Sequence, residues 1–268
     1  MSDAPAAAFF DLDRTLITGS STFYFAIAAW RNKMLPGRYL LTDIAQSLTF
    51  RVLGATDERS ASIRDRILQA VEGIAQDDLI ALNEEIVPRI LESVRPESSG
   101  LIDMHHEAGR DCWIVSASPQ EVVNPLATAL AMEGGIGTQS QVVDGHYTGQ
   151  LDGPFVYGEG KAEAIGKLAA ERGYDLRLSY AYSDSASDLP MMEMVGHPVA
   201  VNPDGPLERV AQQRGWPIVV FARRAKQVVK STTALATAAA LAGATYGLGR
   251  RHGRINSQAR ARRMLPWN

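Results

Sequence analysis

The sequence is poor in cysteine and has no recognisable signal for secretion. Cys112 is its one cysteine, so an intramolecular disulfide framework is excluded and we expect a reducing, cytoplasmic environment. The run Cys112-Trp113-Ile114-Val115 predicts a strand in which this thiol is a small buried hydrophobic group. Residues 1–5 contain neither a basic segment nor a long apolar one, which argues against a secretory signal peptide.

Acidic residues are absent from the last part of the chain, although the net charge is only −3. No Asp or Glu occurs over 222–268, whereas this tail contains Arg223, Arg224, Lys226, Lys230, Arg250, Arg251, Arg254, Arg260, Arg262 and Arg263. Such a tail favours an anionic partner, either lipid headgroups or nucleic acid. Nucleic acid is the weaker hypothesis, because almost no aromatic residue interleaves with the basic ones before Trp267.

Within the tail, residues 231–248 are uncharged but consist mostly of Ala, Thr and Gly. This is about the minimum length for a membrane span, and it is only weakly apolar. A span, a basic helix on the membrane surface and a tail without lipid contact all stay open. We therefore expect a cytoplasmic protein, with a peripheral or anchored position at the inner face of a membrane as the further hypothesis.

Two aspartates follow the first apolar run of the chain. The segment 6–10 is short and ends in two phenylalanines, which predicts a buried strand. Asp11 and Asp13 follow at once, and Thr15 comes next. At the carboxyl end of a strand in an open α/β sheet, these carboxylates would face a ligand crevice. The alternative is a polar loop after an ordinary strand.

The segment from about 18 to about 95 has helical periodicity almost throughout. Its apolar stripes are Phe23, Tyr24, Ile27 and Trp30; Leu40, Leu41, Ile44 and Leu48; Ile63, Ile67, Leu68 and Val71; and Leu79, Leu82, Ile86 and Ile90. This pattern predicts a helical bundle inserted directly after the first strand. We expect the aromatic stripe near Trp30 to lie in the core of that bundle, rather than to form a binding site.

A second predicted strand, 111–116, ends at the hydroxyl of Ser116. Ser118, Pro119 and Glu121 then read as an N-cap, a first helical position and the end of a capping box. A helix N-terminus at this edge would suit a phosphate group, because its free N–H groups and dipole favour anions. The alternative is a cap with a structural role alone.

Three later segments complete the pattern. An Asp-Gly pair predicts a hairpin over 142–149, and a helix is expected over 160–172, closed by Gly173. Lys161 lies in the first turn of that helix, where the dipole disfavours a cation, so either an anionic partner or simple solvation is expected. A run over 178–183 ends in Asp184, and Asp188 follows as a candidate helix cap.

With strands near 199–201 and 218–221, the chain predicts a parallel, doubly wound α/β sheet of about five strands. Its polar strand ends resemble, in order, the four motifs of the haloacid dehalogenase (HAD) superfamily of phosphohydrolases: Asp11-Leu12-Asp13-Arg14-Thr15, Ser116, Lys161 and Asp184-Ser185-Ala186-Ser187-Asp188. The helical insertion resembles the C1 cap of the phosphoserine phosphatase-like subfamily IB. The resemblance implies a core of 1–17 and 96–222, a cap of 18–95 and a tail of 223–268.

The resemblance implies a Mg²⁺-dependent phosphatase for a small phosphorylated substrate. Asp11 would attack phosphorus and become an aspartyl-phosphate, while Asp13 would protonate the leaving group and later activate water. A carboxylate is a weak nucleophile, but that of Asp11 should remain ionised at neutral pH, all the more beside a cation. Mg²⁺ would be held by the carboxylates of Asp11 and Asp184 and by the backbone carbonyl of Asp13.

The remaining motif residues would bind the phosphate or support the metal. Ser116, Ala117 and Lys161 would contact the phosphoryl oxygens, with Ser116 and Lys161 counted among the catalytic residues. Asp188 would position Lys161 or the metal shell from behind.

The substrate is less clear, because the chain departs from the phosphoserine phosphatase pattern. Those enzymes resemble one another in a serine after the second aspartate and an acidic residue that meets the substrate ammonium, whereas this chain has Arg14 and Ser20. Ala117-Ser118 replaces the usual Gly-Gly, and Ser187 stands where they have Asn. Phosphoserine stays the first candidate, with histidinol phosphate and other small phosphomonoesters as competitors.

Other functions were weighed on the same residues. If the tail contacts lipid, a phosphatase of a lysophospholipid or phospholipid headgroup is the alternative. A two-component receiver domain is excluded, because its phospho-acceptor lies on a middle strand and it lacks the helical insertion. A catalytically silent scaffold tethered to a membrane disagrees with the presence of every polar group that the chemistry needs. The oligomeric state does not follow from the sequence.

Overall fold

The computed structural model describes residues 5–34, 64–65, 68–69 and 71–221 of the chain. The described residues belong to one compact unit, 1–221, and the tail 222–268 lies outside the described residues. Among the described residues, no helix is both long and apolar enough to cross a membrane. What the sequence predicts for the basic tail and for the segment 231–248 therefore stays a prediction.

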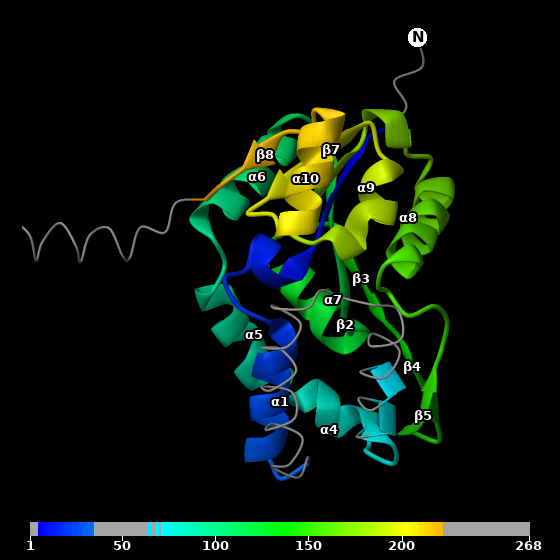
Figure 1. Ribbon diagram of the computed structural model, residues 1–268. Coiled ribbons are helices and arrows are strands. Elements are labelled where there is room, and N and C mark those ends of the chain that lie inside the picture. The colour runs from blue at the N-terminus through cyan, green and yellow to red at the C-terminus, as the bar shows by residue number, and fades with distance from the viewer. Residues whose placement is uncertain (1–4, 35–63, 66–67, 70, 222–268) are drawn as a thin grey trace, which may run out of the picture. The chain divides into compact units, whose positions relative to one another are not determined.

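A six-stranded parallel sheet forms the centre of the first unit, in the order β3-β2-β1-β6-β7-β8 (Figure 1). Its strands are β1 (Ala7–Phe10), β2 (Asp111–Pro119), β3 (Gly134–Thr138), β6 (Tyr180–Ser183), β7 (His197–Val201) and β8 (Ile218–Val219). The predicted doubly wound parallel sheet is confirmed. The strand order reverses beside β1, which is where the crevice of such a sheet lies.

The strand β3 was missed, because its sequence Gly-Gly-Ile-Gly-Thr has little β propensity. The glycines are required by close packing against α7 (Gln120–Ala129). A Cβ atom at Gly135 would lie 2.4 Å from Cγ1 of Val123, and one at Gly137 would lie 2.8 Å from the Cα of Gln120.

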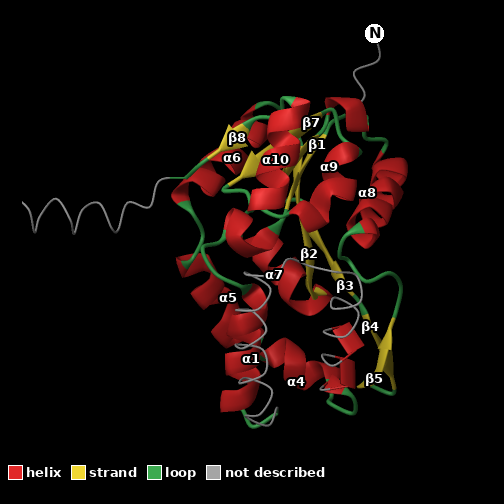
Figure 2. Ribbon diagram, viewed as in Figure 1, coloured by secondary structure: helices red, strands yellow, loops and turns green. Residues whose placement is uncertain are grey.

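Helices cover both faces of the sheet (Figure 2). Phe10 and Ile114 pack on one face with α7 and α6 (Pro96–Glu107), and Phe9 and Val115 pack on the other with three further helices. Those helices are α8 (Glu159–Arg172), α9 (Leu189–Glu193) and α10 (Gly205–Arg214). The strand β1 is buried on both faces, which explains its unbroken apolar sequence.

The described part of the cap contains α1 (Ser21–Arg31), α4 (Gln76–Ala81) and α5 (Asn83–Glu92), grouped at one end of the first unit in Figure 1. The stripe from Leu79 to Ile90 is buried as predicted. The predicted helix α1 forms, but the burial expected for its aromatic stripe is wrong at two positions, since Phe23 is 46% and Trp30 49% exposed. The buried face of α1 instead contains Phe25, Ala28 and Ala29. The stripe 40–48 and positions 63 and 67 lie outside the described residues.

The two remaining local predictions are confirmed. The hairpin consists of β4 (Ser140–Val143) and β5 (His146–Leu151), with Asp144 and Gly145 at positive φ in its turn. The helix α8 ends at Gly173, which adopts the left-handed conformation with φ of 75°.

We predict that Gly160→Ala destabilises the protein, because a Cβ atom there would lie 1.9 Å from the backbone oxygen of Phe155. Overpacking of this kind costs about 1–3 kcal/mol of unfolding free energy. Gly166→Ala, on the same helix, is the matched control: its Cβ would meet only the flexible end of Met194, at 3.4 Å. Chemical denaturation should show a loss for Gly160→Ala and none for Gly166→Ala. Equal stabilities would contradict the packing described for the first turn of α8.

Candidate active site

Asp11 follows the central strand β1 and is 8% exposed. Its backbone N–H donates to the carbonyl oxygen of Tyr182 at 2.9 Å, which continues the β1–β6 pairing by one residue. This hydrogen bond fixes the backbone of Asp11 at the carboxyl edge of the sheet. Its carboxylate therefore lies where the strand order reverses.

Lys161 extends from the first turn of α8 to two carboxylates. Its Nζ lies 2.6 Å from Oδ1 of Asp11 and 2.7 Å from Oδ2 of Asp188, and the lysine is only 3% exposed. Ser183 donates a further hydrogen bond to Oδ2 of Asp188, at 2.7 Å. Burial lowers the pKa of Lys161, but the two carboxylates outweigh it, and the net pKa is raised. These carboxylates are the anionic partner that the position of Lys161 predicts.

Asp13 is held by the first turn of α1. Its Oδ1 accepts hydrogen bonds from the backbone N–H and the hydroxyl of Ser21, both at 2.7 Å, and its Oδ2 accepts one from Ser20 at 3.2 Å. Burial raises the pKa of Asp13, while the bonds from Ser21 oppose that rise. Ser21 was not predicted as a site residue, because it does not follow a predicted strand as Asp11, Ser116 and Asp184 do.

Ser116 is buried near the carboxyl end of β2, and its Oγ accepts a hydrogen bond from the N–H of Ser118 at 3.1 Å. The predicted capping box is wrong. The strand continues to Pro119, and α7 begins at Gln120 without a side-chain cap. The Ser118 hydroxyl instead forms a 2.6 Å hydrogen bond with that of Ser21, which joins β2 to the cap helix α1. Ala117 lies between the two serines in β2.

Asp184 follows β6 and is paired with Arg14. The guanidinium Nε donates to Oδ2 of Asp184 at 2.6 Å, and Nη2 donates to the same oxygen. Burial raises the pKa of Asp184 to about 6, although the charge of Arg14 opposes this rise. In the sequence, Arg14 is recognisable only as a departure from the phosphoserine phosphatase pattern, so its contact with Asp184 could not be predicted there.

Asp188 was proposed as a helix cap as well as a site residue. It stands at the N-cap position of α9 but forms no side-chain cap bond there. Its carboxylate is used by Lys161 and Ser183 instead. Ser187 lies in the short 3-10 helix Ala186–Asp188, where its N–H and hydroxyl donate to Ser185. Asp204, also unpredicted, closes this loop by accepting from the N–H of Ala186 at 3.2 Å.

Negative charge exceeds positive charge among these groups. Asp11, Asp13, Asp184 and Asp188 are all buried or nearly so, and they face one buried lysine and the half-exposed Arg14. Burial and repulsion from two other carboxylates raise the pKa of Asp11, and Lys161 offsets part of the rise. The expectation of an ionised Asp11 concerns the site with its metal and stays a prediction. A divalent cation with oxygen ligands fits this surplus.

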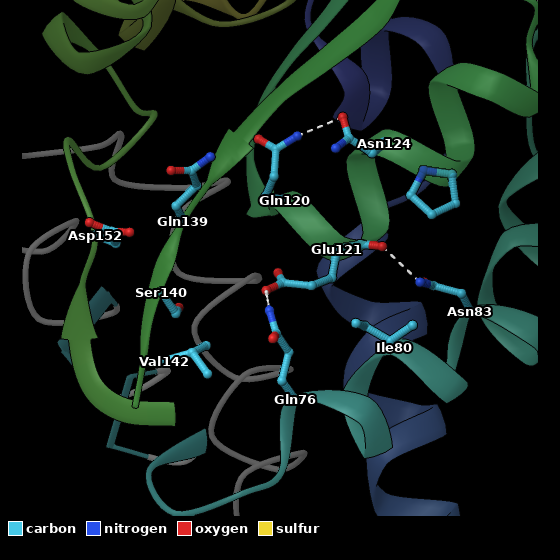
Figure 3. Close-up of a pocket in the computed structure, with 11 residues that line it drawn as sticks. Gln76, Ile80, Asn83, Gln120, Glu121, Asn124, Gln139, Ser140, Val142 and Asp152 are labelled. Atoms are coloured by element: carbon cyan, nitrogen blue, oxygen red, sulfur yellow. Dashed lines mark hydrogen bonds between the residues drawn. The ribbon is translucent and has the colours of Figure 1, made fainter. Parts of the chain in front are cut away.

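A cavity of 510 Å³ lies apart from this cluster, between α4, α7 and β4 (Figure 3). Its lining is mostly amide and carboxylate side chains, and none of the predicted site residues belongs to it. Glu121 on its wall accepts from Tyr147 at 2.8 Å and from Gln76 at 3.4 Å, and its backbone oxygen accepts from Asn83 at 2.7 Å. These bonds join α7 to β5, α4 and α5 along the wall of the cavity.

A second group of potential metal ligands lies at the amino ends of β2 and β3, away from the aspartates. It consists of His106, Cys112 and Glu133. Cys112 is fully buried as predicted, and burial raises the pKa of its thiol to about 12. Glu133 accepts a hydrogen bond from the N–H of Cys112 at 2.5 Å. A protonated thiol and an occupied carboxylate make a poor metal site.

Comparisons with known proteins agree with this geometry. Residues 8–193 match the family model of the haloacid dehalogenase-like hydrolases. A probable phosphatase of Mycobacterium tuberculosis, Rv3661, is 41% identical over 261 residues, covering 92% of this chain and 90% of the relative. Phosphoserine phosphatase SerB1 of the same organism is 38% identical over 241 residues, covering 88% and 78%.

The fold comparison leads to the same group. A solved phospho-aspartyl intermediate analogue of phosphoserine phosphatase superposes with a TM-score of 0.61 at 20% identity, over 85% of this chain and 99% of the other. That likeness shows the fold, while the family match spans most of the core. The chain belongs to the haloacid dehalogenase-like hydrolase family.

Proposed function

We propose that the protein is a Mg²⁺-dependent phosphomonoesterase that acts through an aspartyl-phosphate on Asp11. The observation behind the proposal is the buried ion cluster of Asp11, Lys161 and Asp188 at the end of β1, with Asp13 held beside it. The relatives named as phosphatases support the same reaction class. The substrate class is a small phosphorylated metabolite.

In the first step, a carboxylate oxygen of Asp11 attacks phosphorus, and the bond from phosphorus to the leaving oxygen breaks. Lys161 holds Oδ1 of Asp11 in place and supplies positive charge as the dianionic phosphate approaches. Asp188 fixes the Lys161 ammonium from its other side, with Ser183 holding Asp188 in turn. Ser116 and the backbone N–H of Ala117 would bind phosphoryl oxygens.

Asp13 is suited to proton transfer. Burial raises its pKa, the direction that favours the protonated form of a general acid, and the three hydrogen bonds from Ser20 and Ser21 fix its orientation. In the second step the ionised Asp13 takes a proton from water, whose oxygen attacks the aspartyl-phosphate. Inorganic phosphate leaves, and the carboxylate of Asp11 is regenerated.

The carboxylates of Asp11 and Asp184 and the backbone carbonyl of Asp13 would hold Mg²⁺. The ion would supply charge neutralisation for the phosphoryl group. Hard oxygen donors and the surplus of buried negative charge both suit this ion.

Phosphoserine is the first candidate substrate, supported by the likeness to SerB1. The residue at position 20 is an argument against phosphoserine. Where phosphoserine phosphatases have an acidic residue that meets the substrate ammonium, this chain has Ser20, whose hydroxyl donates to Asp13. Recognition of an amino group would therefore need other residues. Association with an anionic membrane through 223–268, and action on a phospholipid headgroup, stay predictions from the charge of that tail.

The direct test of the proposed function is phosphate release by the full chain, with and without Mg²⁺. The panel contains phosphoserine, histidinol phosphate, phosphocholine and lysophosphatidate. We expect release from a small phosphomonoester that falls on the order of 100-fold or more after chelation. Preference for lysophosphatidate would support the membrane alternative, and absence of release from every compound would contradict the proposal.

Asp11→Asn should reduce turnover by on the order of 10⁴-fold or more, because an amide cannot act as the nucleophile. The side chain keeps its size, so the circular dichroism spectrum should match that of the wild type. Asp65→Asn, on an exposed carboxylate that pairs with Arg64, is the control and should retain full activity. Residual turnover close to wild type in Asp11→Asn would exclude Asp11 as the nucleophile.

Binding of Mg²⁺ should release protons and tighten as the pH rises from about 5 to about 8. The reason is that burial raises the pKa of both carboxyl ligands without metal, that of Asp184 to about 6 and that of Asp11 to about 8. Below these values a carboxyl holds a proton that the metal must displace, and above them the carboxylate is free. Titration calorimetry in two buffers of different ionisation enthalpy measures the protons released. An affinity independent of pH, with no proton release, would contradict a metal site whose carboxyl ligands are protonated before the metal binds.

A further inference from the structure

Arg14 has an unusual backbone conformation for its residue type. Its φ is 65°, in the left-handed region that non-glycine residues rarely adopt. Its N–H donates to the carbonyl oxygen of Gly19 at 3.1 Å, which closes the turn that follows Asp13. A conformation of this kind persists where other contacts favour it. The contact made by the Arg14 side chain is the clearest candidate.

The guanidinium crosses from the loop after β1 to the loop after β6. Two of its N–H groups donate to a single oxygen, Oδ2 of Asp184, and Oδ1 receives neither. The Asp184 side chain is 5% exposed, and that of Arg14 is 43% exposed. Asp11 and Asp204 add Coulomb attraction for the same guanidinium. A buried carboxylate without a partner would be strongly destabilising, and Arg14 removes that penalty.

From this geometry we propose that Arg14 is a built-in counter-ion for the metal ligand Asp184, and that it weakens Mg²⁺ binding by competing for this carboxylate. The inference rests on the proposed function, since it assigns Asp184 to the metal. With no metal bound, the guanidinium supplies the positive charge that the aspartate cluster lacks. When the ion binds, it must share or replace this contact, and two neighbouring positive charges repel each other.

Two measurable quantities are therefore linked. Removing Arg14 should destabilise the metal-free protein, and it should tighten Mg²⁺ binding by a similar free energy. At saturating Mg²⁺ the two effects offset each other. A residue that merely packs against the loop would lower stability equally with and without metal.

The experiment compares the wild type with Arg14→Gln and Arg14→Lys by calorimetric titration with Mg²⁺ and by thermal melts, first in chelator and then at saturating Mg²⁺. Arg14→Lys keeps the positive charge. Arg31→Gln is the control for loss of an arginine elsewhere, because Arg31 forms an exposed pair with Glu85 on the cap. No substrate is present, so neither readout depends on turnover.

We expect Arg14→Gln to bind Mg²⁺ about tenfold more tightly, equivalent to about 1.4 kcal/mol. Its melting temperature should be lower than that of the wild type in chelator, and the gap should close at saturating Mg²⁺. Arg14→Lys and Arg31→Gln should keep wild-type affinity.

Equal or weaker Mg²⁺ binding by Arg14→Gln would overturn the proposal, as would a stability gap that is the same in both conditions. Should neither the wild type nor Arg14→Gln bind Mg²⁺, the metal assignment of the proposed function fails, and the role of Arg14 fails with it. If the wild type and Arg14→Gln bind Mg²⁺ with the same affinity, only the role of Arg14 is refuted, and the metal assignment stands.

Discussion

The buried ammonium of Lys161 is the interaction on which the rest of the site depends. Burying a lysine and two aspartates is expensive unless each charge is paired and hydrogen-bonded. Here one Nζ atom lies within 2.7 Å of both Asp11 and Asp188. The three residues come from β1, α8 and the loop after β6, so the cluster forms only when these elements are packed together. The geometry of the ion cluster therefore depends on the packing of the core.

The architecture brings these elements to one edge. The strand β1 lies between β2 and β6, and all three are parallel, so the polar residues that follow them face the same crevice. The helix α1 also contacts this edge of the sheet, because the hydroxyl of Ser21 forms hydrogen bonds with both Asp13 and Ser118. Asp13, the proposed general acid, is thus oriented by a residue of α1. Movement of the cap would change the contacts of Asp13 as well as access to the site.

Much of this could be predicted from the sequence, because it depends on local patterns. Apolar runs that end in Asp11, Ser116 and Asp184 identify strands and their polar ends, and the position of Lys161 against a helix dipole calls for an anion. What escaped prediction depends on packing between distant segments. Ser118 bonds to Ser21 rather than capping α7, and Arg14 reaches Asp184 170 residues away. Trp30 is exposed because the buried face of α1 is formed by Phe25, Ala28 and Ala29.

The central claim is that Asp11 becomes phosphorylated during turnover. The most direct measurement is mass spectrometry of the peptide containing Asp11 after rapid acid quenching of the full chain with Mg²⁺ and a substrate that it hydrolyses. The account predicts a phosphoryl group on Asp11 that disappears in the Asp11→Asn variant. A phosphoryl group on any other residue during turnover, or one that persists in that variant, would contradict the account.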